Sequence, residues 1–252
     1  MKRIHLEQTD STNNEARRLF DSHSADELDG TVITAGSQSA GKGRVEGRRF
    51  FSPAGTGLYM SLILKLKDSL IEPELITPAA GVAVCRTIEK LTGQQPQIKW
   101  VNDVFLNGKK VCGILTEGIF SPEGGIGAVI VGIGVNVREP ESGFPEDLRD
   151  IVTAVVPQNG ALTPDSFLEE LLAQLSTAFE AARTEETVAA YQAHSLVVGK
   201  RVTVLAGNET YLADVLEVTK KCHLIVCPVD GNGEAASSET RELLSGEVSL
   251  RF

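Results

Sequence analysis

Hydrophobic positions follow two periods along the chain, and the alternation between them predicts a mixture of strands and helices. Apolar runs of strand length are separated by segments whose apolar residues recur every three or four positions. Before residue 196, strands are predicted at residues 4–8, 31–35, 58–64 and 126–137. Residues 97–118 are predicted to form a strand, a turn and a second strand. The predicted helices of the same part span 12–20, 74–91, 164–179 and 185–194.

Turn and capping signals mark the ends of several of these elements. Thr12-Asn-Asn-Glu15 has the spacing of a capping box at the start of the first helix. Gly93 follows the second helix, where a left-handed residue commonly ends a helix. Asn107-Gly108 predicts a tight hairpin turn, because both residues tolerate the positive φ angles that such a turn requires.

After Val198 the helical period disappears and only short strands are predicted, at residues 200–206, 210–219, 224–229 and 246–252. Gly-Asn and Asp-Gly-Asn-Gly turns separate them. We therefore predict two domains, one of mixed helices and strands at residues 1–196 and a small SH3-like barrel at 197–252.

Composition and charge narrow the class of protein. The chain has 252 residues, of which 42% are hydrophobic and 23% charged, as in an ordinary globular protein. Its net charge of −10 argues against DNA as the main partner, since duplex binding requires cationic surfaces. No signal peptide or apolar run of transmembrane length is visible, so we expect a cytoplasmic protein. The four cysteines have no metal-ligand spacing and are expected to be reduced thiols.

A glycine-rich loop at residues 35–49 stands out against this acidic background. It contains Lys42, Arg44, Arg48 and Arg49, and guanidinium groups hold carboxylates and phosphates in two-point contacts. The loop approaches the phosphate-loop pattern GxxxxGK[ST], but Gly43 stands where the hydroxyl residue belongs. It indicates a local anion site; a solvated charged loop is the alternative.

Two further segments carry polar groups at predicted strand ends. Lys99-Trp-Val-Asn-Asp103 places a cation and an amide beside a turn, although a lysine there is often an ordinary edge residue. In Val131-Gly-Ile-Gly-Val-Asn-Val137, the glycines let a ligand or another backbone approach the strand closely. A tightly packed core strand is the alternative for this second segment.

Seven blocks, in order along almost the whole chain, resemble the biotin protein ligases. They are DSTN at 10–13, the loop at 38–44, FSP at 51–53 with LYMS at 58–61, KWVNDV at 99–104, KKVCGILTE at 109–117, GIGVNV at 132–137 and SGEVSLR at 245–251. The resemblance implies an α+β fold, with a mixed-sheet catalytic domain like that of class II aminoacyl-tRNA synthetases and a C-terminal SH3-like barrel. It also implies that ATP, carried with Mg²⁺, converts biotin to biotinyl-5′-AMP, which then acylates one lysine of a biotin carboxyl carrier domain.

The resemblance also implies roles for individual residues. Lys99 and Arg44 are the implied catalytic groups, because cations must offset the repulsion between the biotin carboxylate and the triphosphate. The implied biotin-binding residues are Ser11, Thr12, Asn13, Gln38, Gly41, Lys42, Gly43, Arg44, Lys99 and Gly113. The implied ATP-binding residues are Arg44, Arg48, Lys99, Asn102, Asn136 and Arg251, and no protein ligand to a metal is expected.

Three positions depart from the family pattern: Lys42 replaces an arginine, Glu46 resembles an insertion, and Val101 replaces a proline. We expect the short form that lacks an N-terminal DNA-binding domain, with no operator binding and with homodimer formation left open. Two rival functions are a lipoate or octanoyl transferase of related fold and a non-catalytic module that retains a biotin pocket.

Overall fold

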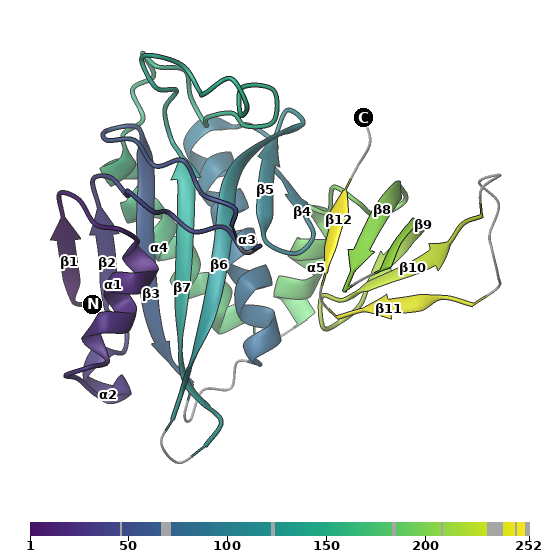
Figure 1. Ribbon diagram of the computed structural model, residues 1–252, viewed down its shortest axis with the longest axis horizontal. Helices are drawn as coiled ribbons and strands as arrows, with labels where there is room; N and C mark the ends of the chain where they lie inside the picture. Colours follow the sequence, from purple (N-terminus) through teal and green to yellow (C-terminus); the bar gives the residue numbers. More distant parts are fainter. Residues whose placement is uncertain are drawn as a thin grey trace.

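Seven strands form a mixed sheet in the order β1-β2-β3-β7-β6-β5-β4 (Figure 1). The strands are β1 (Arg3–Leu6), β2 (Val32–Ala35), β3 (Gly57–Lys65), β4 (Gln97–Lys99), β5 (Asp103–Leu106), β6 (Lys109–Phe120) and β7 (Ile126–Asn136). β1 pairs with β2 in parallel, and the other neighbours pair antiparallel. The computed structural model describes residues 1–45, 47–66, 72–121, 124–182, 185–207, 209–230, 239–244 and 246–249.

Helices cover both faces of this sheet. They are α1 (Thr12–Leu19), α2 (Ala25–Leu28), α3 (Pro73–Thr92), α4 (Pro164–Ala181) and α5 (Glu185–Ala193). Because side chains alternate along a strand, Met60 and Leu62 of β3 enter the large core beneath α3 and α4, whereas Ile63 packs in a smaller cluster with Ala16 and Leu28 of α1 and α2. The face that carries α1 is left partly open, and the candidate site lies there.

The local signals in the sequence are largely confirmed. Asn107 and Gly108 have φ angles of 52° and 78° at the β5–β6 turn, and Gly93 ends α3 with a φ of 71°. The predicted capping box at Thr12 is wrong, because Ser11 occupies the N-cap of α1 and makes no side-chain capping bond. The Thr12 hydroxyl instead contacts Gln38 and Ser61, so tertiary partners have displaced the local cap.

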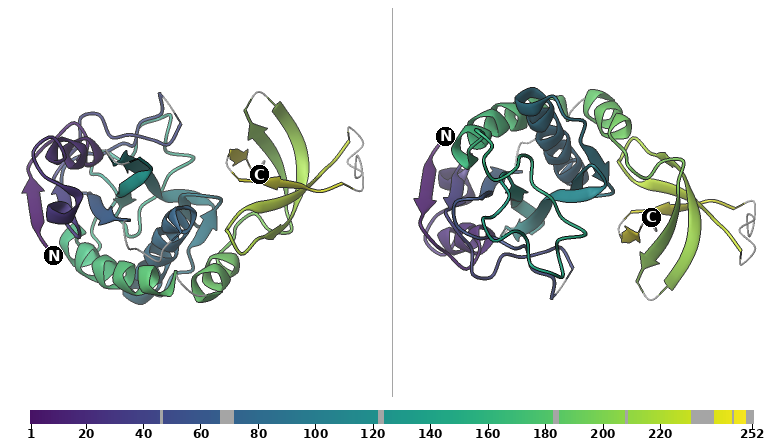
Figure 2. Two further views of the ribbon diagram at one scale, coloured as in Figure 1. Left: turned by 90° about the horizontal axis from the view of Figure 1, so that it is seen from below. Right: turned by 90° about the horizontal axis from the view of Figure 1, so that it is seen from above.

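The C-terminal part is a curved five-stranded antiparallel sheet in the order β11-β10-β9-β8-β12, to the right in Figure 1. Its strands are β8 (Arg201–Ala206), β9 (Glu209–Val218), β10 (Leu224–Pro228), β11 (Arg241–Leu243) and β12 (Glu247–Ser249). The sequence did not predict β11, which has three residues. Views from below and above separate this sheet from the larger one, with α5 between them (Figure 2).

The two sheets nevertheless share one hydrophobic core. Trp100 of the larger domain and Val202 of β8 belong to the same cluster of buried residues. Trp100 Nε1 also donates a hydrogen bond of 2.8 Å to the carbonyl of Cys222. The domain boundary near residue 196 stays a prediction. The four cysteines are free thiols, and no helix in the described part of the chain is long and apolar enough to cross a membrane.

Candidate functional site

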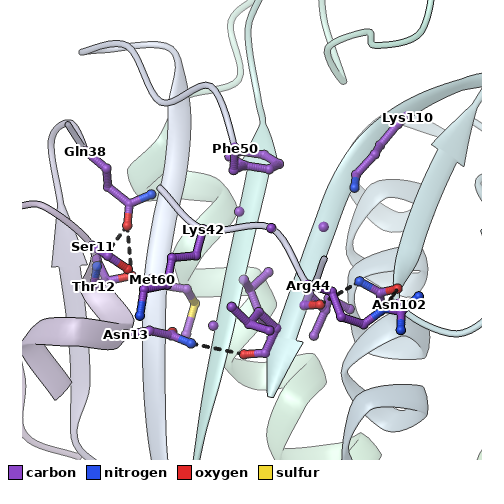
Figure 3. A pocket seen from close by; sticks show the side chains of 17 residues that line it. Ser11, Thr12, Asn13, Gln38, Lys42, Arg44, Phe50, Met60, Asn102 and Lys110 are labelled. Carbon is purple, nitrogen blue, oxygen red and sulfur yellow. Dashed lines mark hydrogen bonds between the residues drawn. The ribbon is translucent and has the colours of Figure 1, made fainter. Parts of the chain in front are cut away.

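A pocket lies on the open face of the larger sheet, between α1 and the glycine-rich loop (Figure 3). Nine of the predicted site residues line it: Ser11, Thr12, Asn13, Gln38, Lys42, Gly43, Arg44, Asn102 and Gly113. The sequence segments that supply them are far apart in the chain, yet they meet over the middle strands of the sheet. The pocket is therefore the candidate functional site.

Neutral hydrogen-bonding groups gather at the α1 end of the pocket (Figure 3). The Oε1 atom of Gln38 accepts a bond of 2.8 Å from the Thr12 backbone N–H, and Gln38 Nε2 donates to Ser52 Oγ at 3.0 Å. One hydrogen of the Gln38 amide and the Ser11 hydroxyl have no partner among the bonds that fix this end. Donor and acceptor capacity thus remains for an uncharged polar ligand.

Glycines form the floor of the pocket. Gly113 of β6 and Gly132 and Gly134 of β7 lie on the same face of the sheet, because they alternate with Ile114 and Ile133 of the core beneath α3. There is no room for a side chain at either position of β7. A Cβ atom at Gly132 would lie 2.2 Å from Asn13 Oδ1, and one at Gly134 would lie 2.8 Å from the Phe50 ring.

Three cations line the pocket, and two of them, Arg44 and Lys110, are held by neighbouring side chains at the end away from α1. Arg44 Nε donates to Asn102 Oδ1 at 3.2 Å, and the Lys110 ammonium lies 2.7 Å from an Asp103 carboxylate oxygen. Lys42 also lines the pocket. Arg44 and Lys110 lie away from Thr12 and Gln38 in Figure 3. A ligand that spans the pocket would meet neutral groups at one end and two fixed cations at the other, with Lys42 between them in Figure 3.

Several predicted site residues do not line the pocket. The Lys99 ammonium lies 5.8 Å from the centre of the Phe105 ring, and burial lowers the pKa of Lys99. Asn136 donates to the Thr153 carbonyl, and Gly41 lies at the base of the loop hairpin, where a Cβ would be 2.6 Å from the Phe50 carbonyl oxygen. Arg251 and Glu46 lie outside the described residues.

Lys110 is the main site residue that the sequence analysis did not single out. It belongs to the KKVCGILTE block, but strict alternation along β6 would place it on the face opposite to Gly113. A bulge in β6, where Val111 is the extra residue between the partners of Val104 and Phe105, brings Lys110 to the same face as Gly113. Phe50, Met60, Ile114, Leu115, Gly132, Ile133 and Gly134 are further lining residues that were not named as site residues.

The glycine-rich loop covers the pocket and contacts the C-terminal sheet. Arg44 Nη2 donates to the Gly246 carbonyl at 2.6 Å, and Arg48 Nη1 lies 2.8 Å from a Glu247 carboxylate oxygen. We call these two interactions the loop–sheet contact. The free space between the pocket walls is about 50 Å³, whereas small-molecule pockets usually measure roughly 300–1,000 Å³. A ligand of that size needs the loop or the lining side chains to shift.

Asp10 fixes the turn that leads into α1. Its carboxylate accepts hydrogen bonds from the Ser11 backbone N–H at 2.8 Å, Asn14 Nδ2 at 2.7 Å and Arg18 Nη2 at 2.7 Å, and from the Thr9 hydroxyl at 3.1 Å. Burial raises the pKa of Asp10, but these bonds outweigh burial and hold its pKa well below the usual range. The ionised carboxylate thus orders the segment that supplies Ser11.

A second cavity, of about 540 Å³, lies between the β5–β6 turn and residues 139–157. Lys109 and Arg149 are its cations, and Lys109 Nζ donates to the Arg149 carbonyl. Its lining also includes Gln94, Glu139, Ser142 and Thr153. The smaller pocket is the better candidate, because it brings together nine of the site residues predicted from the sequence.

The fold matches solved structures over its full length. A biotin protein ligase from Aquifex aeolicus, solved in complex with biotin and ATP, is 28% identical with a TM-score of 0.77, covering 99% of this chain and 98% of that one. The arrangement of a mixed sheet followed by a five-stranded antiparallel sheet is thus shared with that biotin protein ligase.

Sequence comparison gives the family. Residues 5–136 match the model of the Biotin/lipoate A/B protein ligase family, and the chain belongs to this family. The biotin--[acetyl-CoA-carboxylase] ligase of Mycobacterium tuberculosis is 33% identical over 204 residues, or 78% of this chain and 72% of that protein. The bifunctional ligase/repressor BirA of Bacillus spizizenii is 39% identical over 157 residues, and the match spans about half, 47%, of its length.

Proposed function

We propose that this protein is an ATP-dependent biotin ligase. It activates biotin to biotinyl-5′-AMP and transfers the biotinyl group to a lysine of a biotin carboxyl carrier domain. The observation that carries the proposal is the polarity of the pocket, with neutral hydrogen-bonding groups at one end and Arg44 and Lys110 at the other. Biotin has the same polarity, with an uncharged ureido ring at one end and a carboxylate at the other.

Arg44 and Lys110 are proposed to hold the biotin carboxylate against the α-phosphate of ATP. A carboxylate oxygen forms the bond to phosphorus as the bond to pyrophosphate breaks, and fixed cations stabilise the negative charge that both groups bring together. Lys99 and Arg48 are proposed to contact the triphosphate, since both lie in the same charged neighbourhood as Lys110. Asn102, Asn136 and Arg251 remain the proposed contacts to the nucleotide.

Ser11, Thr12 and Gln38 are proposed to bind the ureido ring, and the glycines of the floor let the ring lie against the sheet. The loop then closes over the adenylate and excludes water, which would otherwise hydrolyse the mixed anhydride. In the second half-reaction the acceptor lysine amine attacks the acyl carbon, AMP leaves, and the amine loses a proton. The carboxylate of biotin makes a protein nucleophile unnecessary.

Mg²⁺ is proposed to arrive with the ATP phosphates. Within the described residues, no three His, Cys, Asp or Glu side chains converge on one point, so the donor set of a resident metal centre is not built there. The carrier domain is the proposed partner. Homodimer formation, absence of operator binding and a cytoplasmic location stay predictions.

The proposal is tested by incubating the protein with biotin, ATP, Mg²⁺ and a carrier domain, and measuring the acceptor by mass spectrometry. We expect the mass increase of one biotinyl group, with pyrophosphate released in the first step. A matched reaction with lipoate in place of biotin tests whether the protein is a lipoate transferase. Lipoylation of the acceptor without biotinylation would favour that alternative. Biotin binding without pyrophosphate release would favour the non-catalytic module.

A further inference from the structure

A relay of hydrogen bonds behind the pocket begins at Glu117, a residue of β6 that does not line it. One Glu117 carboxylate oxygen accepts a bond of 2.7 Å from Asn13 Nδ2, and the same amide nitrogen donates to the Leu115 carbonyl at 3.2 Å. Both of these partners are acceptors only. The Asn13 amide is therefore fixed with its nitrogen toward β6 and its oxygen toward Ser61.

The fixed amide determines the direction of the hydroxyl protons. Asn13 Oδ1 lies 2.6 Å from Ser61 Oγ and can only accept, so it takes the single Ser61 hydroxyl proton. Ser61 Oγ also lies 2.8 Å from Thr12 Oγ1, and this contact then requires the proton of Thr12. Gln38 Oε1, a second acceptor of the same proton, lies farther from Thr12 Oγ1, at 3.3 Å. These three side chains are at most 4% exposed, so water does not compete for the bonds.

Thr12 is consequently left with lone pairs toward the pocket. We propose that Glu117 is a positioning residue that, acting through Asn13 and Ser61, makes Thr12 an obligatory acceptor for one N–H of the cyclic urea. This inference rests on the proposed function, because it assigns the polarity of one contact to biotin. Gly132 supports the arrangement, since a Cβ there would lie 2.2 Å from Asn13 Oδ1.

The inference makes a specific prediction about ligand selectivity. Carbamate analogues of biotin, in which oxygen replaces one ring N–H, present a lone pair where biotin presents a hydrogen. Wild-type protein should bind one of the two analogues at least about tenfold more weakly than biotin, as expected when a buried acceptor loses its donor. In Ser61→Ala the Thr12 hydroxyl keeps only its longer contact to Gln38 Oε1, and in Glu117→Ala the Asn13 amide keeps only its longer bond to the Leu115 carbonyl. The Thr12 hydroxyl can then turn and donate more readily, so the discrimination against this analogue should decrease in both variants.

The experiment measures Kd for biotin and both carbamates by calorimetry without ATP, and then KM and kcat with ATP. We expect Glu117→Ala to raise Kd and KM for biotin about tenfold while KM for ATP stays within twofold. Glu117→Gln should recover part of the loss, because its amide oxygen can still accept from Asn13. Arg17→Ala is the matched control: Arg17 is the other partner of Glu117, at 3.2 Å, and half exposed, so selectivity should be unchanged.

Unchanged discrimination in both Ser61→Ala and Glu117→Ala would overturn the inference while leaving the proposed function intact. Failure of the wild-type protein to bind biotin would overturn both. If Glu117→Ala does not fold, Ser61→Ala decides alone, since it removes a single hydroxyl in the middle of the relay.

Discussion

At the scale of single residues, neighbouring lysines on one turn have different surroundings. Lys110 faces the pocket beside Asp103, whereas Lys109 donates to the Arg149 carbonyl on the other side of the strand. Lys99, on β4 beyond β5, is half-buried beside Phe105. Charge alone does not distinguish these three side chains, but their positions do.

We therefore predict a graded effect of three alanine substitutions on adenylate synthesis. Lys110→Ala should slow pyrophosphate release about a hundredfold or more, because a charge-stabilising donor is lost from the reacting centre. Lys99→Ala should mainly raise KM for ATP, and Lys109→Ala is the matched control with nearly normal rates. Steady-state pyrophosphate release with biotin and ATP measures all three; equal rates for the Lys110 and Lys109 variants would contradict the assignment.

Asp10 is the residue with the clearest consequence for pH dependence. Its pKa is lower in the folded protein than in the unfolded chain, so its ionised form stabilises the fold above the unfolded pKa of about 3.9. That contribution is lost progressively as pH falls from about 5 toward the lower folded pKa.

We predict that wild-type protein melts at a higher temperature than Asp10→Asn at pH 7, and that the difference shrinks below about pH 4. Thermal unfolding of both proteins between pH 7 and the lowest pH at which they stay folded measures this convergence. Asp165→Asn, on α4, is a matched control with the same charge change. A difference between wild type and Asp10→Asn that grows on acidification would show that the sign is wrong.

At the scale of elements, the pocket depends on how β6 and β7 place glycines. The two strands are long and otherwise rich in branched residues, and Gly132 and Gly134 interrupt β7 where Asn13 and Phe50 cross its surface. The helices beneath need no such interruption, because the opposite face of the same strands carries Ile133 and Val135. Gly132 and Gly134 thus make room for residues of the pocket and are not required by the packing of the core.

We therefore predict that Gly132→Ala disturbs the pocket, although it adds only one methyl group. The added Cβ would meet the Asn13 amide at 2.2 Å, and we expect a loss of roughly 1–3 kcal/mol in stability together with weaker biotin binding. Gly118→Ala on β6 is the control, since its Cβ would meet Ile126 at 3.4 Å. Chemical denaturation and calorimetry measure the two effects; normal biotin affinity in Gly132→Ala would refute the packing argument.

At the scale of the whole molecule, the C-terminal sheet takes part in closing the pocket. Glu247 of β12 and Gly246, which directly precedes this strand, form the loop–sheet contact, and β12 pairs with β8. The Arg48 side chain is 62% exposed, so its ion pair with Glu247 contributes only about 0.2–1 kcal/mol to stability. A weak contact suits a loop that must open for biotin and ATP.

We predict that Glu247→Gln loosens the loop without unfolding the protein. Trypsin should cleave after Arg44 or Arg48 several times faster in this variant, and added salt should accelerate cleavage in the wild type more than in the variant. Asp214→Asn, which breaks the Arg201 pair on the same sheet, is the control and should leave loop cleavage unchanged. Equal cleavage of wild type and Glu247→Gln would rule out the loop–sheet contact as a restraint.

The sequence by itself determined what depends on neighbouring residues. The turn at Asn107-Gly108 and the helix end at Gly93 follow from local backbone preferences, and the structure confirms them. The periods predicted most strands and helices, but the strand expected to begin at residue 97 is divided into β4 and β5, and α2 was not predicted. The family resemblance also grouped Ser11, Thr12 and Gln38 as site residues, and the structure brings them together in one pocket. The capping prediction was wrong at Thr12, because its hydroxyl contacts Gln38 and Ser61, which are distant in sequence, and does not cap α1.

Only the tertiary structure decided which lysine faces the pocket and what lies behind it. A bulge in β6 at Val111 puts Lys110 on the same face as Gly113, because one extra residue moves a side chain to the other face of a sheet. Glu117 and Asn13 are 104 residues apart in sequence, and Arg48 and Glu247 are 199 apart. No local pattern encodes such pairs, because they form only when the core brings distant strands together.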